Sequence, residues 1–213
     1  MGPLELTPGR LRRQDERPDE TFYGAPRLVA HVDDAAIGAL GRFFAEHIPD
    51  GAEVLDLMSA YLTHLPAEVW QRCRGVTGLG MNQVELDANP QLSASLVHNL
   101  NREPALPFED GSFDVALCTV SVQYLLRPVE VFAEVGRVLR ADGPFIVSFS
   151  NRCFPTKAIA AWLSADDQQH AELVRHYFEA SLCWRDVRVE DISPGSPAWS
   201  DPMYVVWGRR LHR

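Results

Sequence analysis

Short, nearly continuous apolar runs alternate with amphipathic stretches along most of the chain. An apolar run with little polar interruption is typical of a strand buried on both faces of a sheet, whereas apolar residues at helical spacing are typical of a helix that covers such a sheet. The runs predict strands at residues 53–57, 75–81, 94–98, 113–120 and 145–149. Because strands that alternate with helices form parallel sheets with right-handed crossovers, the pattern predicts an α/β fold.

Several stretches between and after these runs have helical periodicity. One begins with Asp33 or Asp34 as its cap, and a Pro-Asp-Gly sequence follows its end. Another opens with Pro128 in its first turn and is expected to end in a left-handed turn at the Asp-Gly pair 142–143. A further stretch covers residues 155–181, where we expect one helical region.

The two ends of the chain differ from its middle. Strands are expected near residues 185–190 and 203–207, and because no helical pattern separates them, they should be antiparallel. Residues 1–20 are rich in proline, arginine and acidic residues, which predicts a mobile tail or a lid that orders on a ligand. Residues 21–213 are expected to form a single domain.

The net charge of the chain argues against some classes of binding partner. The chain has 20 Lys and Arg against 29 Asp and Glu, a formal net charge of −9 at pH 7. Nucleic acids and anionic membranes require a basic surface, so neither is expected as the main partner. The cysteines form no C-x-x-C pair, and no secretory leader or membrane-length apolar stretch is visible. We therefore expect a cytoplasmic protein with reduced thiols.

Lys157 is the only lysine, and its neighbours argue against two nucleotide-binding motifs. Cys153 stands where a short-chain reductase has tyrosine, and Thr156 stands where a P-loop has glycine. A nicotinamide-dependent reductase is therefore disfavoured. No two histidines have H-x-x-x-H spacing, so no metal site is expected.

Two neighbouring segments carry a family resemblance. Residues 106–115 are LPFEDGSFDV, and residues 127–149 are RPVEVFAEVGRVLRADGPFIVSF. Both resemble class I S-adenosylmethionine-dependent methyltransferases, in particular the type 11 group, and the likeness extends over residues 22–149. The resemblance implies a Rossmann-like, doubly wound seven-stranded sheet that is mostly parallel with an antiparallel last strand. It also implies S-adenosyl-L-methionine as the cofactor.

The first cofactor motif departs from the family pattern. The family usually has D-x-G-x-G-x-G after its first strand, whereas residues 56–62 are DLMSAYL, which indicates a glycine-poor subgroup. Small side chains at Ser59 and Ala60 still let the backbone approach a ligand, and Met58 and Leu62 are expected to point away. By resemblance, the cofactor contacts in this loop are Asp56, Met58, Ser59 and Ala60.

Asparagines stand where the family usually has acids. After the second strand, Asn82 is the candidate for the ribose hydroxyls, with Glu85 as the second choice. After the third strand, Asn99 and Leu100 are the candidates for the adenine. These uncharged substitutes fit either a re-engineered or a decayed pocket. The resemblance adds cofactor contacts at Gly80, Met81, Thr119, Val120 and Arg27, the last as a partner of the methionine carboxylate.

A methyltransferase needs no catalytic triad, because the sulfonium already activates the methyl group, and it needs a base only when the acceptor carries a proton. The candidate bases are His31, His64 and Tyr23, each with a structural role as the alternative. The candidates for the acceptor pocket, which follow the fourth and fifth strands, are Tyr124, Gln123 and Arg152. Helix packing and turn hydrogen bonds are the alternative roles for these three residues.

The sequence therefore predicts an S-adenosylmethionine-dependent methyltransferase that acts on a small-molecule acceptor. The alternative is a non-catalytic cofactor-binding or regulatory protein on the same fold, which the missing glycines and the missing ribose acid support. The acceptor and the oligomeric state stay open.

Overall fold

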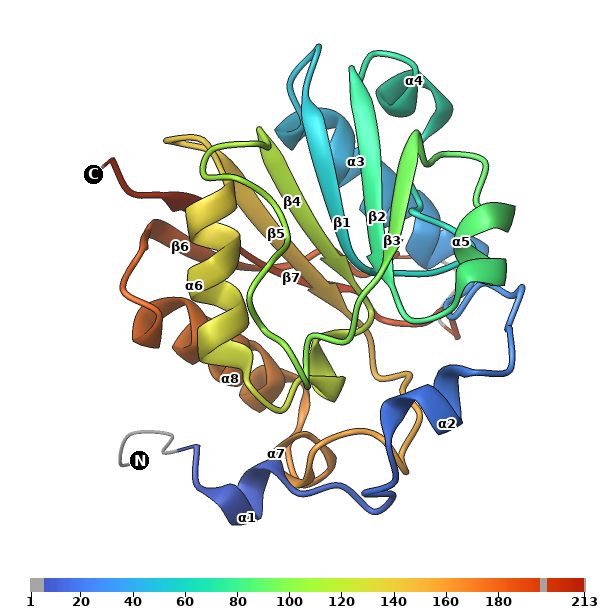
Figure 1. The fold of residues 1–213 in the computed structure, drawn as a ribbon, viewed down its shortest axis with the longest axis vertical. Helices are drawn as coiled ribbons and strands as arrows, with labels where there is room; N and C mark the ends of the chain where they lie inside the picture. Colours follow the sequence, from blue (N-terminus) through green and yellow to red (C-terminus); the bar gives the residue numbers. More distant parts are fainter. Residues whose placement is uncertain (1–5, 196–198, 213) are drawn as a thin grey trace.

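A seven-stranded sheet forms the centre of the protein, which the computed structural model describes over residues 6–195 and 199–212 (Figure 1). The strands are β1 (Glu53–Ser59), β2 (Gly75–Gly80), β3 (Ala94–Val97), β4 (Val115–Thr119), β5 (Pro144–Phe149), β6 (Trp184–Asp191) and β7 (Tyr204–Arg210). Their order is β3-β2-β1-β4-β5-β7-β6, with parallel pairing from β3 to β5 and antiparallel pairing of β7 with both β5 and β6. The expected Rossmann-like, doubly wound sheet with an antiparallel last strand is confirmed.

Helices cover both faces of this sheet (Figure 1). They are α1 (Pro8–Leu11), α2 (Asp19–Tyr23), α3 (Asp34–His47), α4 (Ala67–Trp70), α5 (Gln83–Ala88), α6 (Pro128–Val138), α7 (Ala160–Leu163) and α8 (Asp167–Ala180), with a 3₁₀ turn η1 (Val122–Tyr124). Helices α6 and α8 pack on one face, and α3 packs on the other.

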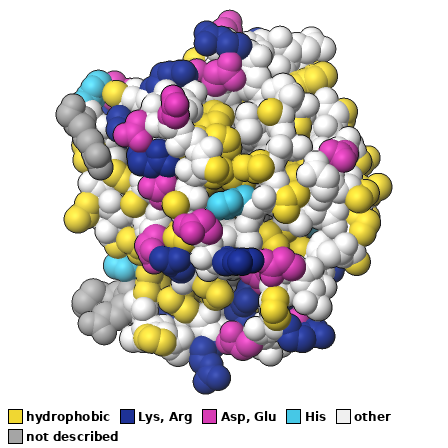
Figure 2. Space-filling model, viewed as in Figure 1, with side chains coloured by type: hydrophobic (Ala, Val, Ile, Leu, Met, Phe, Trp, Pro, Cys, Tyr) yellow, Lys and Arg dark blue, Asp and Glu magenta, His cyan; other side chains and the backbone are white. Residues whose placement is uncertain are grey.

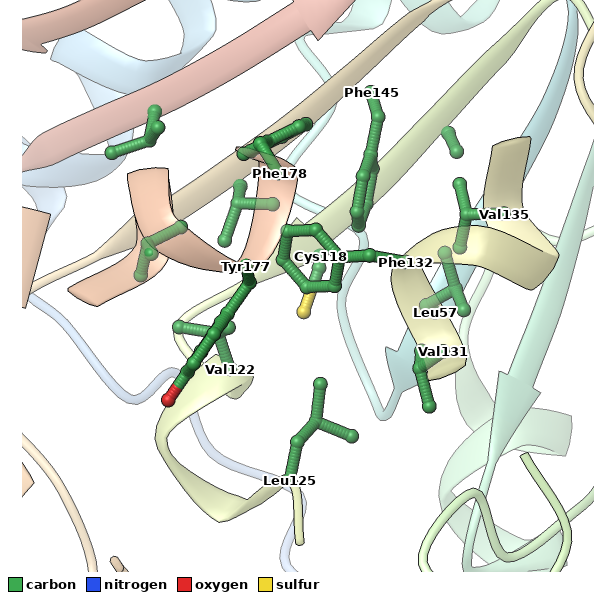
Figure 3. Packing of buried hydrophobic residues seen from close by; sticks show 14 of the residues in the cluster. Leu57, Cys118, Val122, Leu125, Val131, Phe132, Val135, Phe145, Tyr177 and Phe178 are labelled. Atoms are coloured by element: carbon green, nitrogen blue, oxygen red, sulfur yellow. The ribbon is translucent and has the colours of Figure 1, made fainter. Parts of the chain in front are cut away.

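Alternate side chains of the strands build a separate hydrophobic layer on each face. On β4, Leu117 packs with α3, whereas its neighbour Cys118 packs with α6 and α8. In the layer between the sheet and helices α6 and α8, the ring centroid of Phe132 lies 4.9 Å from the ring centroids of both Phe145 and Phe178 (Figure 3). Burial on both faces explains why these strands are nearly continuous apolar runs in the sequence.

The expected starts of two helices are confirmed, and the expected end of one is wrong. The Asp33 carboxylate accepts the Ala36 N–H at 2.9 Å and caps α3, and Pro128 opens α6. Helix α6 ends at Val138 because Leu139 pairs with Phe113 in an isolated β-bridge. The left-handed residue Asp142 (φ 64°) instead forms the turn into β5.

The expectation of one helical region over residues 155–181 is also wrong. Residues 155–159 are turn and coil, α7 is short, and α8 begins after Asp166. The break comes from a capping box in which the Asp166 carboxylate accepts the Gln169 N–H while the Gln169 side chain accepts the Asp166 N–H. The expected apolar face of α8 is buried; it includes Ala171, Val174 and Phe178.

Residues 12–27, here called the strap, run across the end of the sheet from α1 towards α3 and are held by polar contacts. The side chain of Lys157 is fully buried, and its ammonium donates to the carbonyl oxygens of Asp15 (3.2 Å) and Arg17 (2.7 Å). The same ammonium lies 3.3 Å from the Asp19 carboxylate, which also binds the Arg13 guanidinium at 2.7 Å. Residues 6–20 thus have defined contacts, residues 1–5 lie outside the described part, and a lid that moves stays a prediction.

We predict that Lys157→Met lowers the free energy of unfolding by about 3 kcal/mol, because it leaves buried strap carbonyls and part of the Asp19 charge without their partner. Urea unfolding followed by circular dichroism at pH 7 measures this difference. Arg42→Gln, on the exposed surface of α3, is the control and should change the value by less than about 0.5 kcal/mol. A Lys157→Met variant as stable as the control would show that the strap contributes nothing to the fold.

Candidate cofactor and acceptor site

A cavity of about 520 Å³ opens at the carboxyl ends of β1 to β5, beneath the strap. Ligands of open α/β sheets bind at this edge, where the strand order reverses, which here is between β1 and β4. The volume lies within the range of small-molecule sites. The fold therefore places the cavity where the sequence expects a ligand.

The cavity brings together all the candidate site residues except Asn82 and Gln123. The chain at and after β1 contributes Asp56, Met58, Ser59, Ala60 and His64. The ends of β2 and β3 contribute Gly80, Met81, Asn99 and Leu100. The end of β4 contributes Thr119, Val120 and Tyr124, and the loop after β5 contributes Arg152. The chain before α3 contributes Tyr23, Arg27 and His31.

Asn82 is buried, and its side-chain hydrogen bonds are used elsewhere. Its carbonyl oxygen accepts the N–H groups of Val84 and Glu85 at the start of α5. Its amide nitrogen donates to the strap carbonyls of Tyr23 (2.8 Å) and Gly24 (3.1 Å). The structure therefore does not support Asn82 as the ribose contact. Glu85, the second choice, does line the cavity.

Gln123 and Asn99 are also occupied by bonds within the chain. Gln123 is fully buried, and its amide donates to the Val120 carbonyl at 3.0 Å, so it packs beneath the acceptor side rather than facing it. The Asn99 oxygen accepts the N–H groups of Asn101 and Arg102, and its amide donates to the strap carboxylate of Glu20 at 2.9 Å. Asn99 thus lines the cavity with its polar atoms already engaged.

The expectation that Met58 and Leu62 point away from the cavity is wrong, because both line it. The pairing of β1 with β2 shifts register between Leu57 and Ser59, which leaves Met58 as an extra residue in a bulge. Met58 takes the left-handed conformation (φ 56°) that glycine adopts easily. The loop therefore keeps a glycine-like backbone without the glycine.

Strained backbone occurs at the cavity and elsewhere: of the six described non-glycine residues with positive φ, three line the cavity, whereas Asp142, Leu182 and Asp186 do not. Besides Met58, the non-glycine residues His64 (φ 63°) and Val120 (φ 46°) have positive φ, and all three line the cavity. A β-branched residue such as Val120 is a rare outlier in this region. Each such residue costs on the order of 1–3 kcal/mol and persists only where the surroundings impose it, which is typical of functional sites.

The carboxyl group of Asp56 lies at the floor of the cavity and is only 2% exposed. The Ser59 hydroxyl donates to it at 2.6 Å. Burial raises the pKa of Asp56 to about 7, and the hydrogen bonds from Ser59 and Thr63 oppose this shift. Among the described residues no cation is paired with it. The floor thus offers a buried acid suited to a cationic ligand group.

Two histidines and two tyrosines line the cavity in neutral form. Burial lowers the pKa of His31 and, more strongly, that of His64, to about 4. Burial raises the pKa of Tyr23, whose hydroxyl has no hydrogen-bond partner among the described residues. Burial also raises the pKa of Tyr124 to about 12, and the Tyr124 hydroxyl accepts the Phe154 N–H at 2.8 Å.

Sequence reasoning missed several residues of the lining, among them Asp19 and Phe154. Asp19 lies in the segment expected to be a tail, where no local pattern marks it as a cavity residue. Phe154 lies in the polar run after β5, and its single aromatic ring was the available signal. Both positions depend on packing between distant segments.

The described part of the chain shows few features of metal-binding or membrane-spanning proteins. No cluster of three or more His, Cys, Asp or Glu residues there is arranged to hold a metal ion. None of its helices combines the length and apolar character needed to cross a membrane. On the face shown in Figure 2, basic and acidic side chains are interspersed rather than gathered by sign.

Comparisons with known proteins agree with this geometry. The family model described as "Methyltransferase domain" (Methyltransf_11) matches residues 55–147. A "Malonyl-[acyl-carrier protein] O-methyltransferase" from Marinomonas sp. (strain MWYL1) is 24% identical over 88 residues, which are 41% of this chain and 32% of that protein. The chain thus spans about a third of the length of the curated relative it matches.

Solved structures show the same fold. The [4+2]-cyclase SpnF has a TM-score of 0.64 at 17% identity, covering 91% of this chain and 92% of its own. Geranyl diphosphate C-methyltransferase from Streptomyces coelicolor A3(2), in complex with Mg²⁺, geranyl diphosphate and S-adenosyl-L-homocysteine, has a TM-score of 0.59 at 16% identity, covering 97% and 100%. A methyltransferase from Mesorhizobium loti has a TM-score of 0.57 at 15% identity, covering 81% and 98%.

Residues 55–147 thus match a methyltransferase domain, and the fold is that of class I S-adenosylmethionine-dependent methyltransferases. The cofactor of that family carries a sulfonium and an ammonium group. The buried, unpaired carboxyl of Asp56 and the left-handed backbone at Met58 fit a cationic ligand at the end of β1. The residues present therefore fit S-adenosyl-L-methionine.

The raised pKa of Asp56 makes stability depend on pH. Because the folded chain holds this proton up to about pH 7, whereas the unfolded chain loses it near the ordinary aspartate pKa of 3.8, the free energy of unfolding falls as pH rises between these values. The full shift corresponds to about 4 kcal/mol. Asp56→Asn has no charge to ionise, so its advantage over the wild type should be small at pH 4 and grow by about that amount at pH 8.

Urea unfolding of both proteins at the two pH values checks this expectation. Asp87→Asn, which changes an exposed carboxylate of α5, is the matched control and should track the wild type at both. An equal difference between Asp56→Asn and the wild type at pH 4 and pH 8 would contradict the raised pKa.

Proposed function

We propose that the protein is an S-adenosylmethionine-dependent methyltransferase that acts on a small-molecule acceptor. The observation that carries this proposal is the buried carboxyl of Asp56, which has no cationic partner among the described residues and lies on the floor of a covered cavity at the end of β1. The left-handed backbone at Met58 and Val120 beside it adds support. The cavity volume suits a cofactor with a small acceptor better than a macromolecule.

The cofactor half of the cavity lies at the ends of β1, β2 and β3. We assign the methionine ammonium to Asp56, with Ser59 and Ala60 as backbone contacts. Because the Asn82 side chain is hydrogen-bonded to the strap, we assign the ribose hydroxyls to Glu85, which lines the cavity. We assign the adenine to Asn99 and Leu100, which follow β3.

The acceptor half lies at the ends of β4 and β5. S-adenosylmethionine, when bound, supplies an electrophilic methyl group. The chain's part is to hold the acceptor atom in line and to exclude water, and such positioning contributes on the order of 7–11 kcal/mol to lowering a barrier. The strap and the Tyr23, Tyr124 and Phe154 rings cover this half.

Proton transfer is needed only for an acceptor that carries a proton at the reacting atom. His31 and His64 are neutral near pH 7 because burial lowers the pKa of both, so either imidazole is free to take that proton. His31 is the stronger candidate, because the pKa of His64, about 4, makes it a weak base. The Tyr23 hydroxyl stays protonated and is a hydrogen-bond donor rather than a base.

The alternative is a cofactor-binding protein without turnover. The absence of glycine in the loop after β1 and the engagement of Asn82 and Asn99 with the strap favour it. Both functions require the cofactor, so methyl transfer to an acceptor separates them.

We predict that S-adenosyl-L-homocysteine binds the wild type and that Asp56→Asn raises its dissociation constant at least about tenfold at pH 8, because the variant loses a charge-assisted contact. Isothermal titration calorimetry measures both constants. Asp87→Asn is the control and should bind like the wild type. Failure of the wild type to bind the compound at millimolar concentration would reject the proposal. Tight binding without methyl transfer to any acceptor of a metabolite panel would favour the alternative.

A further inference from the structure

Arg27 lies in the wall of the cavity with its guanidinium fixed in place. The guanidinium carbon lies 4.6 Å from the ring centroid of Phe22 and 5.3 Å from that of Phe154. Its Nη1 donates to the Ala25 carbonyl at 3.2 Å, and its Nη2 donates to the Phe22 carbonyl at 3.1 Å. Since a guanidinium has five N–H groups, three remain for another partner.

Among the described residues, Arg27 is a cation of the cavity region without a carboxylate partner. No carboxylate oxygen of these residues is within 4.0 Å of its guanidinium nitrogens, and Glu85 instead accepts its backbone N–H at 2.6 Å. By contrast, Lys157 is paired with Asp19, and Arg152 lies 3.6 Å from Asp201. An unpaired cation in a cavity is notable in a chain whose net charge is −9.

The unpaired acidic side chains and the Arg27 guanidinium lie in different halves of the cavity. Two acids that line the cavity without a salt-bridge partner among the described residues, Asp56 at the end of β1 and Glu85 on α5, lie in the cofactor half. The Arg27 guanidinium contacts Phe154, which follows β5, and His31 lies 5.5 Å from the same ring. His31 and Tyr124 are neutral, and burial raises the pKa of Cys153, so that thiol is neutral as well. The acceptor half therefore has a positive centre.

The methionine carboxylate of the cofactor is the competing partner for Arg27. Two observations favour the acceptor instead: the guanidinium packs on the ring that follows β5, and its position is fixed from both sides by the strap and that loop. On the cofactor side, Glu85 accepts only the Arg27 backbone N–H, and no described residue of the loop after β1 contacts the guanidinium. We propose that the acceptor half binds a methyl acceptor with a planar body and a carboxylate, and that Arg27 binds this carboxylate; the proposal rests on the proposed function.

The planar body follows from the rings around Arg27. Tyr124 and Phe154 are stacked with centroids 5.9 Å apart, and Tyr23 lies edge-on to Tyr124 at 6.5 Å. Flat apolar walls favour a flat apolar ligand, because aromatic rings gain most from stacked and edge-on contacts. An aromatic carboxylate has both required features.

Benzoate and benzamide test whether Arg27 binds an aromatic carboxylate, because the two molecules have the same shape and differ in charge. Their dissociation constants are measured by ligand-observed NMR on protein saturated with S-adenosyl-L-homocysteine. Benzoate should bind about tenfold more tightly than benzamide to the wild type, as expected for one charge-assisted hydrogen bond. In Arg27→Gln the two constants should become equal, whereas Arg42→Gln should keep the tenfold preference. Arg27→Lys, which keeps the charge, should keep part of it and also serves if Arg27→Gln does not fold.

A second pair of ligands tests the competing assignment. 5′-Methylthioadenosine lacks the amino acid end of S-adenosyl-L-homocysteine. If Arg27→Gln weakens S-adenosyl-L-homocysteine but not 5′-methylthioadenosine, Arg27 binds the cofactor and the proposal is overturned. It is also overturned if the wild type binds benzoate and benzamide equally, or if the preference survives in Arg27→Gln. If S-adenosyl-L-homocysteine does not bind at all, the proposed function fails, while the two aromatic ligands on the free protein still test the role of Arg27.

Discussion

The site depends on a buried acid that the protein itself does not neutralise. Asp56 sits at the end of β1, with hydroxyl groups around it and no cation beside it among the described residues. Burying such a group costs free energy, and burial accordingly raises its pKa. Met58 in the next turn adds backbone strain at the same place. Features that lower stability and are concentrated in one cavity indicate selection for binding, since stability alone would remove them.

The departures from the family motif are connected through the strap. Asn82 and Asn99, which stand where acids are usual, hold the strap through Tyr23, Gly24 and Glu20. An asparagine amide can donate to a carbonyl or carboxylate, which an ionised acid cannot do. With these substitutions, Asn82 and Asn99 bind the strap above the cavity instead of the ligand. The buried ammonium of Lys157 holds the other end of the strap. This account favours a re-engineered pocket over a decayed one.

The sequence predicted the strands and the region of the site, because these follow from local apolar runs and from the rule that parallel strands present ligands at their carboxyl ends, while the doubly wound seven-stranded sheet was implied by the family resemblance. It did not predict the division of residues 155–181, which depends on a reciprocal cap at Asp166, or the inward position of Met58, which depends on a bulge. It also assigned Asn82 to a ligand, because a segment about sixty residues away was not known to compete for the same amide. Local patterns identify which residues can bind, but long-range contacts decide which remain free to do so.

Two charges of the cavity, those of Asp56 and Arg27, explain why one cavity suits two ligands. Asp56 and Arg27 do not neutralise each other, because the acid lies on the floor at the end of β1 and the guanidinium is fixed between Phe22 and Phe154. In the proposed arrangement the cationic groups of the cofactor pair with Asp56, and the carboxylate of the acceptor pairs with Arg27. Because each ligand pairs with a different charge of the cavity, the fold gains most when both are present. The separation of charge thus favours the ternary complex, in which the sulfonium and the acceptor are held in the same water-poor cavity.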